Sequence, residues 1–325
     1  MCKIEKDVAL QILRNLLLIR EVEKKIIHLF SQRQMRCPVH LSIGEEASAV
    51  GICQVLKRDD MVFSNHRCHA HYLAKGGDVM RMFAELYGRD AGCCSGMGGS
   101  MHLVDQSVNM MGSSSIVASS IPIAVGAAWK KKLENSQVVT VAFFGDAAME
   151  EGVVYESMNF AALHGLSVIF VCEDNGLATY TPIVDRQPNN AIAKRAQAFM
   201  YYRAIKRGDD CAEIFGVANE IITNKQYPAF IHVPVVRFTE HVGPKYETEV
   251  GVVDSKNIQH QMDNFCPVIF WERYLSQSYT CVTQTEIQDI TLSVEKIIDD
   301  AVIFAQRSAF PKQDCLNKIT WEVRQ

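Results

Sequence analysis

The segment spanning residues 138–182 constrains the fold of this chain most strongly. Residues Val138–Phe144 form an apolar run of strand length without polar alternation, which is typical of a strand buried on both faces. A helical stretch opens with Glu150 and Glu151, and a second apolar run follows at Ser167–Cys172. A strand, a helix and a strand in this order predict two parallel strands joined by a right-handed crossover. We therefore predict an α/β fold with a mostly parallel sheet and helices on both of its faces.

Both predicted strands end in polar residues. Gly145, Asp146 and Ala147 follow the first strand, and Asp174 and Asn175 follow the second. Open α/β sheets bind ligands at the carboxyl ends of their parallel strands. The Asp146 carboxylate and the Asn175 amide oxygen are hard ligands that suit a small divalent cation such as Mg²⁺, and the backbone amides after Asp146 suit phosphates. The alternative is that Asp146 only caps a helix and Asn175 only turns a loop.

Composition narrows the class of protein. Apolar residues make up 48% of the 325 residues and the formal net charge is -4, so there is no basic footprint for nucleic acid or an acidic membrane. The 11 cysteines include no CxxC spacing, and several lie inside apolar runs, which is typical of reduced, buried thiols in the cytosol. The first ten residues resemble neither a secretory signal nor a transit sequence, and no run of eighteen apolar residues occurs. We expect a cytoplasmic location without a membrane span.

The remaining periodicity predicts one domain over residues 1–325, without a repeat or a linker. An amphipathic N-terminal helix over residues 7–32 either contacts another subunit or packs on its own domain. The other predicted helices are 44–56, 78–87, a helix from Pro122 to Lys132, 211–223, 268–275 and 285–306, where the pieces from about Val253 onward are covering helices. Further strands are predicted at 61–64 and 230–238, and residues 179–202 are predicted as a long loop with a short helix near 191–198.

A cluster of histidines follows the predicted strand at 61–64. The stretch His66–His71 holds three histidines, a cysteine and Arg67 within six residues. A zinc site is one interpretation, but the sequence contains no second ligand cluster. An anion pocket is the other, because an arginine after a strand can offer forked donors to a phosphate. The strand at 230–238 likewise delivers Arg237, Glu240 and His241 to a strand end.

These residues together resemble a known family. Gly145-Asp146-Ala147, then 26 residues, then Asp174-Asn175 is similar to the thiamine-diphosphate motif. With His40–Ala47 and Gly98–His102 in the same order, the chain resembles, over most of its length, the alpha subunits of thiamine-diphosphate-dependent 2-oxo acid dehydrogenases. The pyruvate, branched-chain and acetoin enzymes belong to that group. The resemblance implies the thiamine-diphosphate-binding fold, with thiamine diphosphate and Mg²⁺ as cofactors.

The resemblance also implies roles for particular residues. The implied metal ligands are Asp146, Asn175 and the backbone carbonyl of Leu177, and the implied catalytic histidines are His40, His69 and His241. The implied cofactor contacts are His66, Arg67, Ser115, Val117, Gly145, Asp146, Ala147, Ala148, Asn175, Arg237 and His241. Pyruvate dehydrogenases carry a serine after the loop histidine, whereas this chain has Val242, so regulation by phosphorylation at that position is not available.

The implied activity is oxidative decarboxylation of a 2-oxo acid, or cleavage of acetoin, with transfer of the acyl group to a lipoyl carrier. A ketol or acyl transfer without lipoamide is the alternative among enzymes, and the altered motif residues Ala147, Asp174 and Leu177 also leave a non-catalytic homologue open. In the family the glutamate that activates the pyrimidine lies on the beta subunit, and no residue here matches it. The implied partners are therefore a transketolase-like beta subunit in an α2β2 assembly, a lipoyl acyltransferase and a small carbonyl substrate.

Overall fold

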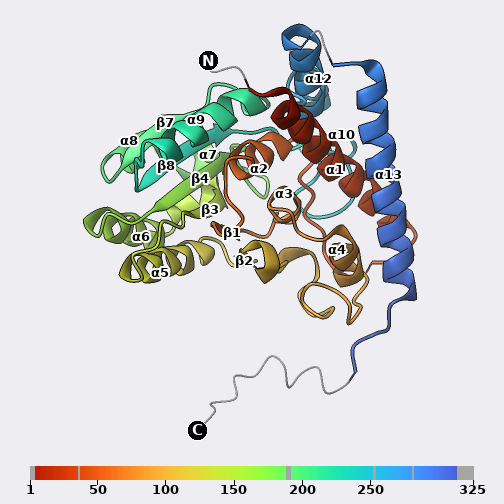
Figure 1. Cartoon of the computed structure of the whole chain (residues 1–325), viewed down its shortest axis with the longest axis horizontal. Coiled ribbons are helices and arrows are strands. Elements are labelled where there is room, and N and C mark those ends of the chain that lie inside the picture. The colour runs from red at the N-terminus through yellow and green to blue at the C-terminus, as the bar shows by residue number, and fades with distance from the viewer. Residues whose placement is uncertain (1–3, 36, 188–191, 252–253, 280–281, 313–325) are drawn as a thin grey trace.

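A six-stranded sheet lies at the centre of the computed structural model, which describes residues 4–35, 37–187, 192–251, 254–279 and 282–312 (Figure 1). The strand order is β2-β1-β3-β4-β8-β7, and every pairing within this sheet is parallel. The strands are β1 (Met61–Ser64), β2 (Met110–Ser113), β3 (Thr140–Gly145), β4 (Val168–Asp174), β7 (Tyr201–Ala204) and β8 (Ala229–Pro234). The predicted α/β class and the parallel pairing of β3 with β4 are confirmed.

Helices cover both faces of the sheet because the buried strands are apolar on both sides. On β3, Val141 and Phe143 belong to a core formed with one set of helices, whereas Phe144 belongs to a core formed with another. The first set is α1 (Lys6–Ser31), α2 (Glu46–Cys53), α3 (His69–Ala74), α4 (Val79–Leu86), α9 (Cys211–Thr223), α12 (Pro267–Ser278) and α13 (Gln284–Arg307). The second set is α5 (Ser120–Leu133), α6 (Gly152–Leu163) and α8 (Ile192–Gln197), and Figure 1 shows α5 and α6 side by side below the sheet.

The long helix α1 packs on the rest of its own chain, the second of the two predicted roles. Trp271 of α12 is fully buried and donates its indole N–H to the carbonyl of Ala9 at 3.0 Å. Lys25 of α1 pairs with Asp299 of α13 at 2.8 Å, and α13 runs beside both α1 and α4 (Figure 1). None of the helices within the described ranges is long and apolar enough to cross a membrane.

The structure differs from the predicted elements mainly at the edges of the sheet. The short strands β2 and β7 were not predicted, because each is four residues long and only partly buried, so neither shows the apolar run of a central strand. The predicted loop 179–202 contains structure: an antiparallel pair β5 (Leu177–Ala178) and β6 (Thr181–Pro182), then α7 (Ile183–Arg186) and α8. Of the short helix predicted near 191–198, residue 191 lies outside the described residues.

Two predicted boundaries also move. Strand β8 ends at Pro234, which has no N–H to continue the ladder, and not at residue 238. The helix predicted from Glu150 begins instead with a 3-10 turn at Asp146–Glu150, followed by α6. Toward the C-terminus, α10 (Glu247–Val250) and α11 (Ser255–Asn264) precede α12 and α13, and Val253 lies outside the described residues.

Candidate active site

The carboxyl ends of four parallel strands meet at one edge of the sheet. Gly145 at the end of β3 lies beside Glu173 of β4, and Asp174 lies beside Pro234 of β8. On the other side of β3 lies β1, which ends at Ser64. The chain continues from β1 to its outer neighbour β2, whereas it continues from β3 to β4 on the opposite side, so it leaves β1 and β3 in opposite directions. This reversal of strand order opens a crevice outside the sheet. The crevice is a cavity with about 990 Å³ of empty space, part of it open to solvent.

The cavity lining brings together nearly all the residues predicted from the sequence. It contains His40, His66, Arg67, Ser115, Val117, Gly145, Asp146, Ala147, Ala148, Asn175, Leu177, Arg237 and His241. These residues come from segments that are far apart in the chain, and all except His40 lie at or after the carboxyl end of a strand of the parallel sheet. Ser115 and Val117 lie at the exposed rim, where Val117 is 46% exposed.

His69 does not belong to this cavity, and the prediction of a catalytic role for it does not fit its position. The ring is fully buried at the start of α3, between Glu23 at 3.0 Å and Ser100 at 2.8 Å. Both ring nitrogens are therefore used to tie α3 to α1 and to the glycine-rich segment. The sequence pattern placed His69 near the site because it could not show that the first turn of α3 points this ring inward.

The zinc interpretation of residues 66–71 is also not supported, because the side chains diverge. Cys68 contacts the carbonyl of Ser100 at 3.2 Å, and His71 contacts Ser64 at 2.8 Å and Glu173 at 3.0 Å. Among the described residues, the groups that could hold a metal do not include His69 or His71. The anion-pocket interpretation fits Arg67, which lines the cavity.

Asp146 is a buried carboxylate directly after β3. It is 1% exposed, and burial raises its pKa to about 6, against the opposing effect of Arg186. Arg186 of α7 pairs with Asp146 and also with Glu150. A carboxylate withdrawn from water is stabilised by a cation, and in this structure the guanidinium of Arg186 supplies it.

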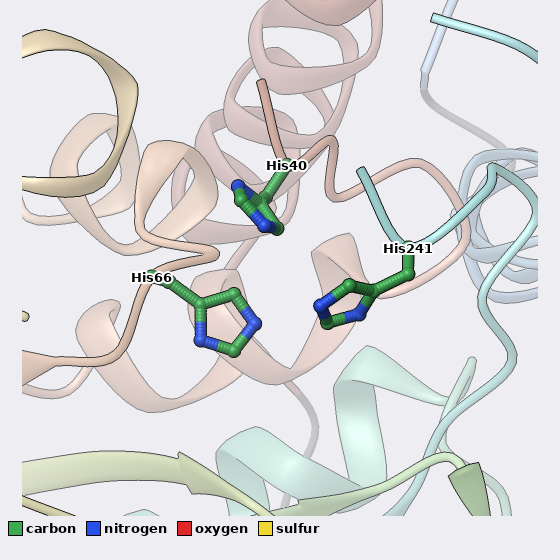
Figure 2. A group of neighbouring side chains, drawn as sticks. All are labelled: His40, His66 and His241. Atoms are coloured by element: carbon green, nitrogen blue, oxygen red, sulfur yellow. The ribbon is translucent and has the colours of Figure 1, made fainter. Parts of the chain in front are cut away.

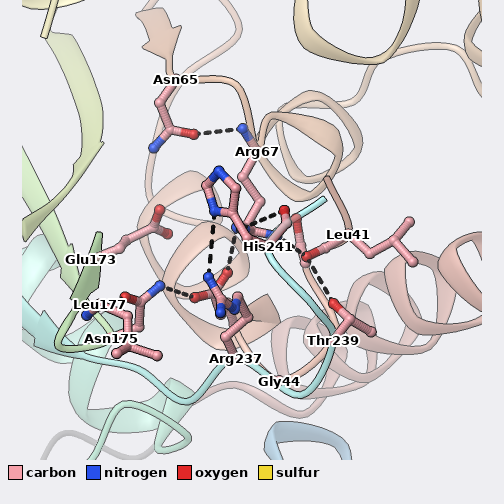
Figure 3. Close-up of polar contacts among 12 residues, drawn as sticks. Leu41, Gly44, Asn65, Arg67, Glu173, Asn175, Leu177, Arg237, Thr239 and His241 are labelled. Carbon is pink, nitrogen blue, oxygen red and sulfur yellow. Dashed lines mark hydrogen bonds and ion pairs between the residues drawn. The ribbon is translucent and has the colours of Figure 1, made fainter. Parts of the chain in front are cut away.

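Asn175 lies at the end of β4 and is held by its own loop. Its side-chain oxygen accepts from the N–H of Leu177 at 3.0 Å, and its side-chain nitrogen donates to Glu45 at 3.1 Å (Figure 3). Glu45 is buried, and burial raises its pKa, with Arg67 opposing that rise. These contacts fix the loop that carries Asn175 and Leu177 beside the end of β3.

Two arginines of the cavity are each neutralised by a buried carboxylate. Arg67 pairs with Glu45 at 3.2 Å and donates to backbone carbonyls, including that of His241 at 3.3 Å. Arg237 pairs with Glu247 of α10, while its Nε atom is buried without a hydrogen-bond partner among the described residues. Figure 3 shows both guanidiniums at the centre of this network. The arginines are thus held in place before any ligand binds.

Three imidazoles converge at one end of the cavity (Figure 2). The ring centroids of His40, His66 and His241 are 4.8 to 5.3 Å apart. Burial, with further contributions from neighbouring histidines and arginines, lowers the pKa of His40 to about 2, of His66 to about 3 and of His241 to about 4. All three rings are therefore neutral near pH 7.

Several polar residues around the cavity received no role from the sequence. Glu45, Glu173 and Thr179 line the cavity, and Arg186, which is not part of the lining, pairs with Asp146. Glu45 carried a usable signal, since the resembling motif His40–Ala47 contains it. Arg186 carried none, because residues 179–202 show no period that would position a single arginine.

Known proteins are similar to this chain over most of its length. The sequence matches the family of the dehydrogenase E1 component over residues 14–314. It is 33% identical over 312 residues to the alpha subunit of acetoin:2,6-dichlorophenolindophenol oxidoreductase from Bacillus subtilis, which covers 94% of this chain and 91% of that relative. It is 29% identical over 315 residues to the pyruvate dehydrogenase E1 component subunit alpha of Rickettsia bellii, covering 95% of this chain and 94% of the relative.

Proposed function

The chain belongs to the dehydrogenase E1 component family, and we propose that it is the alpha-type chain of an enzyme that oxidatively decarboxylates a 2-oxo acid or cleaves acetoin. Transfer of the acyl group to a lipoyl carrier is part of the proposal. The relatives' printed names are those of oxidoreductases and dehydrogenases, which favours this reaction over a ketol transfer without lipoamide. The observation that carries the proposal is that Asp146 and Asn175 follow the ends of two neighbouring strands and both line the cavity.

The residues present fit thiamine diphosphate with a divalent cation, the cofactor of this family. Asp146, Asn175 and the backbone of Leu177 offer only oxygen ligands, which Mg²⁺ prefers. Burial raises the pKa of Asp146 to about 6, and a cation beside the carboxylate favours its charged form; Arg186 occupies that place in this structure and a bound metal ion can take it. Arg237 lines the same cavity, and its Nε atom is a buried donor without a partner among the described residues, as is expected of a group that receives a polar ligand.

The altered motif residues are compatible with binding. Ala147 replaces a glycine, but its φ is not positive, so the alanine can hold this backbone and present its amide without strain. Asp174 accepts from Gly176 at 2.9 Å and contacts His232 at 2.8 Å, so it shapes the loop that carries Asn175. These contacts favour a working site over a non-catalytic homologue.

When bound, thiamine diphosphate supplies a centre that can stabilise a carbanion next to a former carbonyl group. The chain's own contribution is positioning and proton transfer. Arg67 and Arg237 are held by Glu45 and Glu247, so they can receive a diphosphate without reorganising. Neutral His40 and His241 each offer one ring N–H and one unprotonated ring nitrogen, through which a proton can pass to or from a substrate in a cavity that burial partly protects from water.

The proposed site is completed by a second chain. Ile116 and Val117 are exposed apolar residues, 71% and 46% exposed, and Val117 lines the cavity at its rim together with Ser115, at the end assigned to the pyrimidine. No glutamate of the described lining takes the place of the family's activating glutamate, since Glu45 and Glu173 are already bonded to Arg67 and His71. We assign the activating glutamate to a transketolase-like beta subunit in an α2β2 assembly, and we propose a lipoyl acyltransferase as a further partner.

A cytoplasmic location is also proposed, in keeping with the free cysteines.

The test is an assay of the chain with and without a beta subunit encoded beside it. Thiamine diphosphate, Mg²⁺ and an artificial electron acceptor are supplied, and 2-oxo acids and acetoin are offered separately. We expect turnover only when both chains are present, and acyl transfer when a lipoyl domain replaces the artificial acceptor. Turnover by this chain alone would overturn the shared site, and ketol transfer without any oxidant would establish the alternative reaction.

A further inference from the structure

The three imidazoles at the end of the cavity form a cluster with ligand geometry. His40 precedes α2, His66 follows β1 and His241 follows β8, so three separate segments deliver them. Figure 2 shows the rings turned toward one another, and one nitrogen of each lies within 4.8 Å of the other two. We name these three side chains the histidine triad.

One nitrogen of the triad is buried and has no partner. His40 is 7% exposed, and its Nδ1 atom makes no hydrogen bond with any residue that the structure describes. Buried polar atoms in folded proteins are almost always paired, so an orphaned nitrogen in a cavity wall points to a ligand. His241 is only weakly held, since Arg237 reaches its Nδ1 at 3.4 Å, at the long limit for a hydrogen bond.

The distances allow a metal to bind with a small movement. Zinc binds histidine nitrogen at about 2.0–2.1 Å in tetrahedral geometry, which places the ligand nitrogens roughly 3.4 Å apart. The distance between any two triad nitrogens would therefore shorten by at most about 1.5 Å, which small side-chain rotations can supply. Three histidines leave a fourth position open toward the cavity, as in catalytic zinc sites.

The triad differs chemically from the Asp146 site. The Asp146 site offers oxygen atoms, which suit Mg²⁺, whereas the triad offers imidazole nitrogen, which suits Zn²⁺, Cu²⁺ or Ni²⁺. The neighbouring positive charges are compensated, because Arg67 pairs with Glu45 and Arg237 with Glu247. These ion pairs reduce the repulsion that a divalent ion meets at the triad from the two guanidiniums.

We propose that His40, His66 and His241 form a second metal site that binds a borderline divalent transition metal such as Zn²⁺. The site is separate from the oxygen site at Asp146. An ion there uses the ring nitrogens of His40 and His241, so it inhibits turnover; that consequence rests on the proposed function, whereas the binding itself does not.

The experiment measures Zn²⁺ binding by the full chain in competition with a chromophoric zinc indicator, with Mg²⁺ in excess. We expect one equivalent of Zn²⁺ that Mg²⁺ does not displace. Co²⁺ in its place should give the visible bands of a low-coordinate nitrogen site without thiolate charge-transfer absorption. A residue that only orients a metal ligand typically contributes about 10- to 100-fold to metal affinity. His66 is itself a proposed ligand, so His66→Gln should weaken Zn²⁺ binding by at least about 100-fold.

Matched variants separate the triad from other ligands. His28→Gln removes a histidine of α1 that contacts Gln32 outside the cavity, and it should leave binding unchanged. Cys93→Ser with Cys94→Ser removes the thiols of the other metal-capable cluster, which also contains Glu85, and should likewise leave binding unchanged. Asp146→Ala should keep the Zn²⁺ equivalent, so this result is independent of whether the proposed cofactor site is correct.

Two outcomes would overturn the proposal: unchanged Zn²⁺ affinity in both His66→Gln and His40→Gln, or loss of the equivalent in the double cysteine variant. The circular dichroism spectrum and Tm of each variant show that it is folded. His66 is partly exposed, so His66→Gln tests the site even where the more buried His40→Gln fails to fold.

Discussion

Asp146 is the residue on which the cation site depends. Burial raises its pKa to about 6, so it changes charge within an accessible pH range. A cation binds the carboxylate and competes with the proton. We predict that the affinity for Mg²⁺ with thiamine diphosphate is constant above about pH 6 and falls about tenfold per pH unit below it. Calorimetric titration between pH 5 and 8 measures this, and a flat affinity across pH 6 would contradict the assigned ligand.

His241 lines the cavity beside His40 and His66. We predict that His241→Ala reduces turnover about 100- to 10,000-fold, the usual contribution of an acid–base group, with a modest loss of cofactor affinity. Steady-state kinetics with the beta subunit and a binding titration separate the two effects. His28→Ala serves as the control, and wild-type turnover by His241→Ala would remove its proposed role.

Much of the site was predictable from residue types at strand ends, but the orientation of buried side chains and their ion pairs was not. Asp146, Asn175, Arg67 and Arg237 follow strands, and parallel strands must bring those ends to one edge. The family resemblance implied a catalytic role for His69, whereas the structure buries this ring at the start of α3, and a sequence does not reveal which way a ring points once a helix begins there. Ion pairs such as that of Asp146 with a residue 40 positions later leave no trace in the sequence pattern.

The segment Leu177–Arg186 acts as one element at the scale of secondary structure. Its first residue belongs to the proposed metal site, its β5–β6 pair folds back, and its last residue, Arg186, pairs with Asp146. Binding of Mg²⁺ must displace that guanidinium. We predict that Arg186→Gln tightens the binding of Mg²⁺ alone on the order of tenfold, because a competing cation is lost.

Direct titration of Mg²⁺ measures this effect without any turnover. Lys194→Gln removes a positive charge on the neighbouring helix α8 and is the matched control. Weaker Mg²⁺ binding by Arg186→Gln would show that Arg186 supports the site and does not compete with the cation.

The contact of α12 with α1 is the best test of the packing at this scale. Trp271 is fully buried and bonded to the carbonyl of Ala9. We predict that Trp271→Ala lowers the free energy of unfolding by about 3–5 kcal/mol, whereas Leu292→Ala on the exposed side of α13 changes it by less than about 0.5 kcal/mol. Urea denaturation measures both, and equal effects would contradict the packing of α1 on its own chain.

Elements with strong apolar patterns were predictable, whereas the short, half-exposed strands at the edges of the sheet were not. Strands β3 and β4 are buried on both faces, so their composition alone identified them, and α1 showed a clear amphipathic pattern. Strand β7 lies at the edge of the sheet with side chains half exposed, and its pairing with β8 comes from the tertiary arrangement.

At the scale of the whole molecule, the chain presents one half of a site. Its cavity holds two compensated arginines, a buried carboxylate and three neutral imidazoles, and its open rim carries Ile116 and Val117 in contact with solvent. The metal and diphosphate groups belong to this half. The central claim is that this chain alone provides the cation-dependent diphosphate site of a thiamine-diphosphate enzyme.

The most direct test is a calorimetric titration of thiamine diphosphate into the concentrated chain, with and without Mg²⁺, for the wild type, Asp146→Ala and the control Asp185→Ala on the exposed side of α7. For the wild type we predict weak binding of thiamine diphosphate that requires Mg²⁺ and is displaced by inorganic pyrophosphate. Asp185→Ala should keep this binding, and Asp146→Ala should lose it. Unchanged, Mg²⁺-dependent affinity in Asp146→Ala would contradict the claim.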